Sequence, residues 1–170
     1  MTKTELKKYI NSLDRESLEQ MILDLYSAQK SVKEYIDYTA NPNDKELFEK
    51  YKAIIYKEFY PKRGYGKMRF SVCRKAVAEF KKFQPSPELL ADLMLSIPEF
   101  ASEIAKGSDL WEQFYTATEN NFIAAMKFIN KEKLLPLFQK RIDKILNNCK
   151  SSGYGFPDTM QQIYEEIDIF

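Results

Sequence analysis

The residues best suited to chemistry lie in the short segment RGYGKMRF, at positions 63–70. Together with the preceding Lys62, it carries four cationic side chains, no acidic one, and two of the five glycines in the chain. Glycine lets a backbone approach an anion closely, arginine can hold a phosphate through two parallel hydrogen bonds, and a tyrosine ring can stack on a base. The segment therefore predicts a site for a phosphate or a nucleic acid. The candidate residues are Lys62, Arg63, Tyr65, Lys67, Arg69 and Arg74.

A structural interpretation explains many of the same residues. A turn between two helices needs glycine, and lysines solvate the exposed side of a helix. Charge is also segregated, because residues 62–82 hold eight basic side chains and one acidic one, whereas residues 88–119 hold seven acidic and one basic. Arg69 or Arg74 could pair with that acidic segment, which would make the segregation an internal docking device. A second Gly-Tyr-Gly, in the sequence GYGFPD near the C-terminus, has few basic neighbours and indicates a turn.

The composition excludes several kinds of catalytic site. The chain has no histidine, which removes Ser-His-Asp and Cys-His mechanisms and every zinc site that contains histidine. The two cysteines, Cys73 and Cys149, cannot form a four-cysteine metal site. Cys73 falls on the apolar side of its predicted helix, which indicates a buried thiol and not a reactive one. We expect no metal and no other cofactor.

Carboxylates are the remaining groups that could hold Mg²⁺ or act as acid and base. Two groups of them are spaced closely, namely Glu99 with Glu103, and Glu165 with Glu166 and Asp168. Such spacing is common on solvated helix surfaces and in polar terminal turns. We interpret both groups in that way, and keep a carboxylate- or metal-dependent enzyme as a third functional hypothesis.

The bulk composition is that of a globular protein. The 170 residues are 44% hydrophobic and carry a net charge of only +1, and their number fits a single domain over residues 1–170. The N-terminal sequence MTKTELKKYINSLDRE lacks the apolar segment of a signal peptide, and no stretch approaches the roughly 18 apolar residues of a membrane span. We therefore expect a cytoplasmic protein with reduced thiols and no membrane contact.

Apolar residues recur at helical spacing along almost the whole chain. This periodicity predicts helices over residues 6–13, 14–40, 44–60, 70–83, 87–106, 109–129 and 135–149, and a terminal helix capped by Asp158. Asp14 is a suitable N-cap for the second of them. Ser96 and Glu99 flank Pro98 at the spacing of a capping box, which predicts a kink or a restart there. The sequence thus predicts an all-α fold, either a compact multi-helix bundle or a short stack of antiparallel helical hairpins.

Two long segments resemble a known family. They are VKEYIDYTANPNDKELFEKYKAIIYKEFYPKRG, residues 32–64, and MRFSVCRKAVAEFKKFQPSPELLADLML, residues 68–95. Both resemble an uncharacterised bacterial family, a domain of unknown function whose members are small, all-helical proteins of about this length. The segment SIPEFASEIAKGSDLW, with Pro98, departs from the family pattern. The resemblance implies an all-helical fold and assigns no activity, cofactor or catalytic residue.

These observations favour a non-catalytic binding module over an enzyme. The first hypothesis is a helical adaptor that binds another protein through an exposed aromatic face or through the basic residues 62–82. The alternative is nucleic-acid or phosphate binding through the Gly-Tyr-Gly segment at residues 62–75. A nucleic-acid binder requires its cations exposed on one face, whereas an adaptor requires exposed apolar side chains and an enzyme requires a pocket with converging acids.

Overall fold

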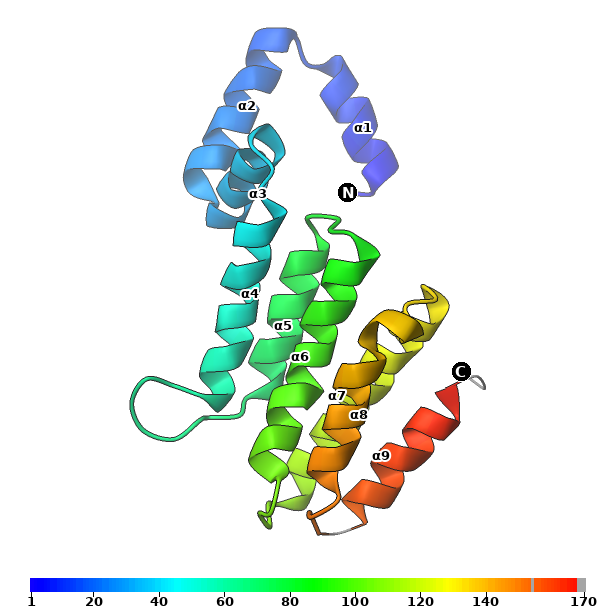
Figure 1. Ribbon diagram of the computed structural model, residues 1–170. Helices are drawn as coiled ribbons and strands as arrows, with labels where there is room; N and C mark the ends of the chain where they lie inside the picture. The colour runs from blue at the N-terminus through cyan, green and yellow to red at the C-terminus, as the bar shows by residue number, and fades with distance from the viewer. Residues whose placement is uncertain (154, 168–170) are drawn as a thin grey trace. The chain divides into compact units, whose positions relative to one another are not determined.

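The computed structural model describes residues 1–153 and 155–167 (Figure 1). This part of the chain forms nine α-helices and no strand, which confirms the predicted all-α fold. The helices fall into two compact units, Met1–Asn43 and the residues from Asp44 onward. Whether both units belong to one folding domain stays a prediction, and each unit is described separately.

The first unit consists of α1 (Lys3–Ser12), α2 (Arg15–Ala28) and α3 (Lys30–Ala40). The side chain of Asp14 accepts a hydrogen bond from the backbone N–H of Ser17 at 2.7 Å, so the predicted N-cap of α2 is confirmed. None of the residues in these three helices is buried.

The predicted single helix over residues 14–40 is wrong. The backbone of Gln29 adopts φ −125° and ψ 108°, outside the helical region, and thereby separates α2 from α3. The break lets the two helices pack against each other, and the Tyr26 hydroxyl donates a hydrogen bond to Asp37 at 2.8 Å. Both helices keep their apolar residues on one side, so the apolar spacing continues through the break and does not reveal it.

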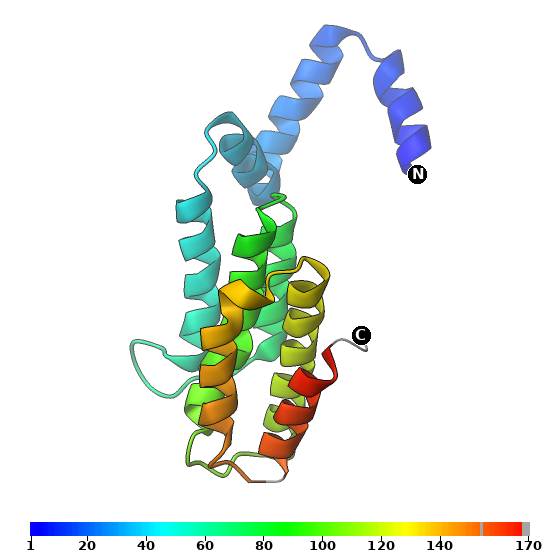
Figure 2. The same cartoon turned by 45° about the vertical axis from the view of Figure 1, so that its right-hand side comes forward.

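The second unit packs its helices around one central helix (Figure 2). Its helices are α4 (Asp44–Phe59), α5 (Phe70–Lys81), α6 (Pro87–Ala105), α7 (Glu112–Lys131), α8 (Leu135–Cys149) and α9 (Phe156–Glu165). The central helix α6 contacts α4, α5, α7 and α8, and α9 packs against α7 and α8. Among the described helices, none is both long and apolar enough to cross a bilayer.

Aromatic rings form much of the core of this unit. The rings of Phe59 and Phe70 lie 5.7 Å apart, and Phe70 in turn lies 5.4 Å from Phe114, so one chain of edge-on contacts joins α4, α5 and α7. Phe156, at the start of α9, is fully buried, and its ring lies 4.7 Å from that of Tyr115. These contacts follow the apolar periodicity from which the helices were predicted.

The predicted restart at Pro98 is wrong, because α6 continues without interruption from Pro87 to Ala105. Ser96 does not act as a cap, since its hydroxyl donates to the carbonyl of Asp92 at 2.9 Å within the helix. Pro98 is buried, and packing on several sides of α6 offsets the hydrogen bond that a proline cannot donate.

The start of α7 also differs from the prediction. The helix begins at Glu112, a few residues later than expected. The Tyr115 hydroxyl accepts a hydrogen bond from the backbone N–H of Leu110 and donates one to the carbonyl of Ser108, both at 3.0 Å. These two bonds satisfy backbone groups of the preceding loop, which therefore does not need to be helical.

Both cysteines should be inert in the folded protein. Cys73 and Cys149 are free and fully buried, and burial raises the pKa of each thiol to about 12. At pH 8 only about one thiol in ten thousand is therefore ionised, so we expect negligible reaction with a disulfide reagent until the chain unfolds. The release of thiolate from Ellman's reagent, with and without urea, measures this.

A Ser71→Cys variant is the matched control, because Ser71 is exposed on the same helix as Cys73. Its added thiol should react at once in the folded protein. Rapid modification of Cys73 or Cys149 without denaturant would contradict the burial of these side chains.

Candidate functional site

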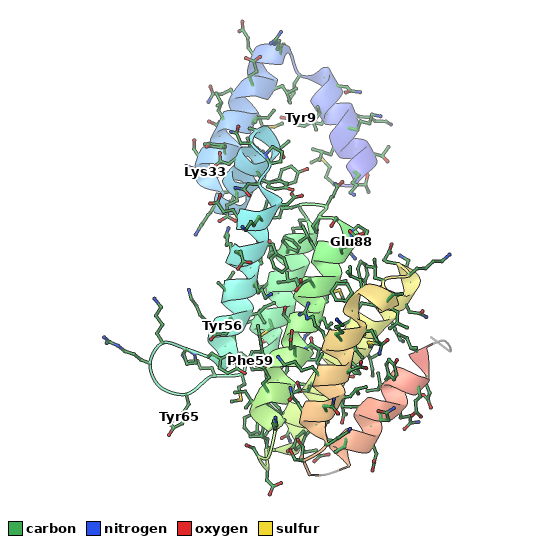
Figure 3. The ribbon with its side chains drawn as sticks, viewed as in Figure 1. Tyr9, Lys33, Tyr56, Phe59, Tyr65 and Glu88 are labelled. Atoms are coloured by element: carbon green, nitrogen blue, oxygen red, sulfur yellow. The ribbon has the colours of Figure 1, made fainter. Side chains whose placement is uncertain are left out.

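The predicted site lies on the loop of residues 60–69 between α4 and α5, here called the basic loop (Figure 3). The loop extends beyond the helices of its unit, and the labelled side chain of Tyr65 points away from them. Tyr65 is 98% exposed, and Lys62, Arg63 and Lys67 are exposed beside it. The tip of the loop thus presents one aromatic ring among three cations.

Glu58 fixes the C-terminal end of the basic loop. Although it is an acid, it is only 6% exposed, and its carboxylate accepts hydrogen bonds from Arg69 Nε at 2.9 Å and Arg69 Nη2 at 2.7 Å. The backbone N–H of Arg69 donates to the same carboxylate at 3.2 Å. These hydrogen bonds hold the pKa of Glu58 below its ordinary value, and they outweigh the opposite effect of burial.

Gly66 is required by the end of α4 and not by a ligand. A Cβ atom at this position would lie 2.5 Å from the carbonyl oxygen of Phe59 and 2.6 Å from that of Glu58. The next residue but one, Met68, donates its backbone N–H to the same Glu58 carbonyl at 2.8 Å. Gly64 has φ +73° with open space around it, which explains glycine there by the turn alone. Both glycines therefore shape the loop.

The six predicted site residues fall into three groups. Lys62, Arg63, Tyr65 and Lys67 lie together on the loop, and none of them has a hydrogen bond or ion pair with another described side chain. Arg69 is half exposed but is paired with Glu58. Arg74 lies on α5, where it lines a cavity that contains no residue of the basic loop.

Three of the seven acids in residues 88–119 pair with α8 and not with the basic residues 62–82. Arg141 Nη2 lies 2.6 Å from Glu99, and its Nη1 lies 2.8 Å from Asp92, the second contact being an ion pair without hydrogen-bond geometry. Lys144 lies 2.6 Å from Glu103. The charge segregation does include internal docking, but the cations are Arg141 and Lys144 of α8 and Lys52 of α4, whose Nζ lies 3.7 Å from Asp92. Arg69 pairs with Glu58 of α4 and not, as the charge segregation suggested, with an acid of residues 88–119.

The interpretation of Glu99 and Glu103 as a solvated helix surface is therefore wrong. The side chain of Glu99 is only 14% exposed, and Glu103 also accepts a hydrogen bond from the Tyr60 hydroxyl at 2.8 Å. Among the described residues, no group of three or more histidine, cysteine or acidic side chains is placed to hold a metal ion. Asp168, named with the second acidic group, lies outside the described residues.

Sequence reasoning missed Glu58 and Arg141 as organising residues. Glu58 follows Tyr51 and Ile55 at helical spacing, so an acid stands in line with the apolar face of α4. A charge in such a position is buried only when it is paired, which is the signal that could have identified it. Arg141 gives no comparable signal, because its partners lie more than forty residues away in the sequence.

With this geometry in place, comparison with known proteins identifies the family. The model of a family of unknown function (DUF6155) matches residues 1–168. The chain belongs to this family. The predicted resemblance to a family of unknown function with small all-helical members is confirmed, whereas the bacterial origin stays a prediction. No match was found among curated proteins or among solved structures.

Removal of the buried carboxylate should loosen the basic loop. A Glu58→Gln variant of this DUF6155 chain is expected to lose about 2 kcal/mol of unfolding free energy at neutral pH, because the Arg69 guanidinium loses its charged partner. The pKa of Glu58 in the folded state lies below the ordinary 4.5. The stabilisation is therefore present above pH 4.5 and is lost as the pH falls through the folded pKa.

Urea unfolding at pH 7 and at about pH 3 tests this, since the wild type should approach the variant at the lower pH. Glu79→Gln is the control, because Glu79 makes only a surface pair with Lys82 and should change the stability by less than about 0.5 kcal/mol. A constant difference between wild type and Glu58→Gln at both pH values would contradict the assigned role of the carboxylate.

Proposed function

We propose that the protein is a non-catalytic interaction module that binds another protein through helices α1–α3. One observation carries the proposal: none of the residues in these helices is buried, yet large apolar side chains recur along them. The most exposed of these are Leu23 at 59%, Tyr9 at 50% and Ile22 at 45%. Scattered apolar residues are normal on a surface, but a whole helical unit without a core is not.

The proposed partner surface is an amphipathic helix of another protein. The apolar residues of α2 include Met21, Ile22 and Leu25, at the spacing by which one helix packs on another. The first unit carries nearly equal numbers of acidic and basic residues, so its charge does not favour a polyanion. Each square ångström of apolar surface that a partner removes from water contributes about 25 cal/mol to the binding free energy. The exposed apolar side chains of α1–α3 would supply this contribution.

The same proposal places the protein in the bacterial cytoplasm, without a cofactor and without catalytic activity. It is supported by the two cysteines, which are free thiols, and by the absence of histidine from the sequence. The paired carboxylates of α6 give further support, because their lone pairs are already used by Arg141 and Lys144.

A photoreactive amino acid in place of Leu23, in the full chain and in living cells, should form an adduct with a second protein. The crosslinked peptide, identified by mass spectrometry, is expected to come from an amphipathic helix of that protein. The same probe in place of Glu16, a polar exposed residue of α2, is the matched control and should give no such adduct.

The adduct should be lost in an Ile22→Asp/Leu25→Asp variant, since charges on the apolar side disfavour burial against a partner. Adducts that join Leu23 only to residues of the same chain, or to a second copy, would contradict binding to another protein. Such adducts would show that the apolar side of these helices is covered by the same chain or by a second copy of it.

A second candidate function is supported by the basic loop. Tyr65 is almost fully exposed, and Lys62, Arg63 and Lys67 beside it form no hydrogen bond or ion pair with another described side chain. Lys67 has a longer-range electrostatic interaction with Glu58. An exposed aromatic ring among free cations is the combination by which single-stranded nucleic acid is bound without sequence preference. Under this proposal Arg69 and Glu58 hold the loop, and the other cations contact phosphates.

Fluorescence anisotropy of a labelled single-stranded oligonucleotide tests the second candidate. If three loop cations contact phosphates, the affinity should fall about twentyfold between roughly 50 and 200 mM salt. An Arg63→Ala/Lys67→Ala variant should lose most of the binding, and Tyr65→Ala should weaken it at both salt concentrations.

Lys7→Ala/Lys8→Ala is the matched control, because both lysines are exposed on α1 and removing them changes the net charge equally. Equal weakening by this control would mean that any binding is due to net charge alone. No binding at the lower salt concentration would remove nucleic acid from consideration.

A further inference from the structure

A cavity of about 170 Å³ opens between α5, α6 and α7 of the second unit. We propose that it binds a small apolar carboxylate, whose charge is held by Arg74 at the mouth. The lining residues that carry this inference are Arg74 and Val77 from α5, Met94 and Ile97 from α6, and Asn120 and Ala124 from α7.

The interior of the cavity is apolar. Ile97 is 2% exposed, and Met94 stands one helical turn before it, so the two side chains form a floor on α6. Val77 adds a short apolar wall from α5. Because a cavity of about 150 Å³ holds one benzene-sized molecule, this space fits a group of about six to eight carbon atoms and not a helix or a nucleotide.

The mouth of the cavity supplies one positive charge. Arg74, Asn120 and Ala124 are exposed, whereas Ile97 is buried, which places the polar groups at the opening. Neither the guanidinium of Arg74 nor the amide of Asn120 makes a hydrogen bond or ion pair with another described side chain. Arginine holds a carboxylate through two parallel hydrogen bonds, and the amide can donate a further one.

The chemistry of the mouth separates a carboxylate from other anions. Arg74 is the one cation that lines the cavity in the described part of the chain, and a phosphate monoester would carry nearly two negative charges into it. The neighbouring Asn121 is neutral and donates from its amide N–H₂ to the carbonyl of Ala117 at 2.7 Å, so it adds no charge to the cavity. An apolar body with one negative charge therefore complements the cavity.

This inference is independent of the proposed partner binding and of the nucleic-acid candidate. No residue of α1–α3 or of the basic loop lines the cavity. Loss of either of those functions would leave this one unaffected, and its test uses different residues.

The test is a titration of the full-length protein with hexanoate and with 1-hexanol, followed by the ¹³C-methyl resonances of Met94 and Ile97. Hexanoate is expected to shift both resonances with a dissociation constant in about the millimolar range, as its few atoms allow. Arg74→Gln should weaken hexanoate at least about tenfold and leave the weaker binding of hexanol unchanged. Arg63→Gln, which removes a basic-loop arginine that has no partner among the described residues, is the matched control and should bind hexanoate as the wild type does.

Ala124→Leu tests the cavity itself, because Ala124 is exposed and the larger side chain fills the opening. It should abolish the shifts with both ligands. Unchanged methyl resonances in the wild type at about 10 mM hexanoate would overturn the proposal, since that concentration exceeds the expected dissociation constant. Equal binding of the acid and the alcohol, or equal weakening by Arg63→Gln, would overturn the assignment of a carboxylate to Arg74.

Discussion

The stability of the second unit depends on the burial of α6 by its neighbouring helices. Ten of the nineteen residues of this helix are buried, on most of its circumference, and a helix of that kind is stable only inside other elements. Helices α4, α5, α7 and α8 supply the cover. Their packing keeps α6 continuous through Pro98. The cavity lies where α5 and α7 leave part of the surface of α6 uncovered.

The polar side of the same helix carries acidic side chains that form ion pairs with a neighbouring helix. Its carboxylates face α8, whose Arg141 and Lys144 neutralise them at short distances. Such part-buried pairs favour this packing of α6 against α8, because either partner left alone would carry an uncompensated charge. Arg141 and Lys144 pair with Asp92, Glu99 and Glu103, whereas Arg69, between α4 and α5, pairs with Glu58.

The two units differ in what they offer to other molecules. The second unit has its own aromatic core, and its candidate binding features are local: a loop held by Glu58 and a cavity beside Arg74. The first unit has amphipathic helices in which no residue is buried.

The sequence by itself determined the all-α fold, most helix positions and the grouping of Lys62, Arg63, Tyr65 and Lys67 on one segment between helices, because apolar spacing, caps and turn residues act over a few positions. Only the tertiary structure decided that these four side chains are exposed. Only the tertiary structure decided the break between α2 and α3, the continuity of α6 at Pro98, and the partners of the charged residues. Those outcomes depend on which distant side chains meet, and local spacing carries no information about that. The separation of Arg69 from Arg74 has the same cause, since one meets Glu58 of α4 and the other lines a cavity with α6 and α7.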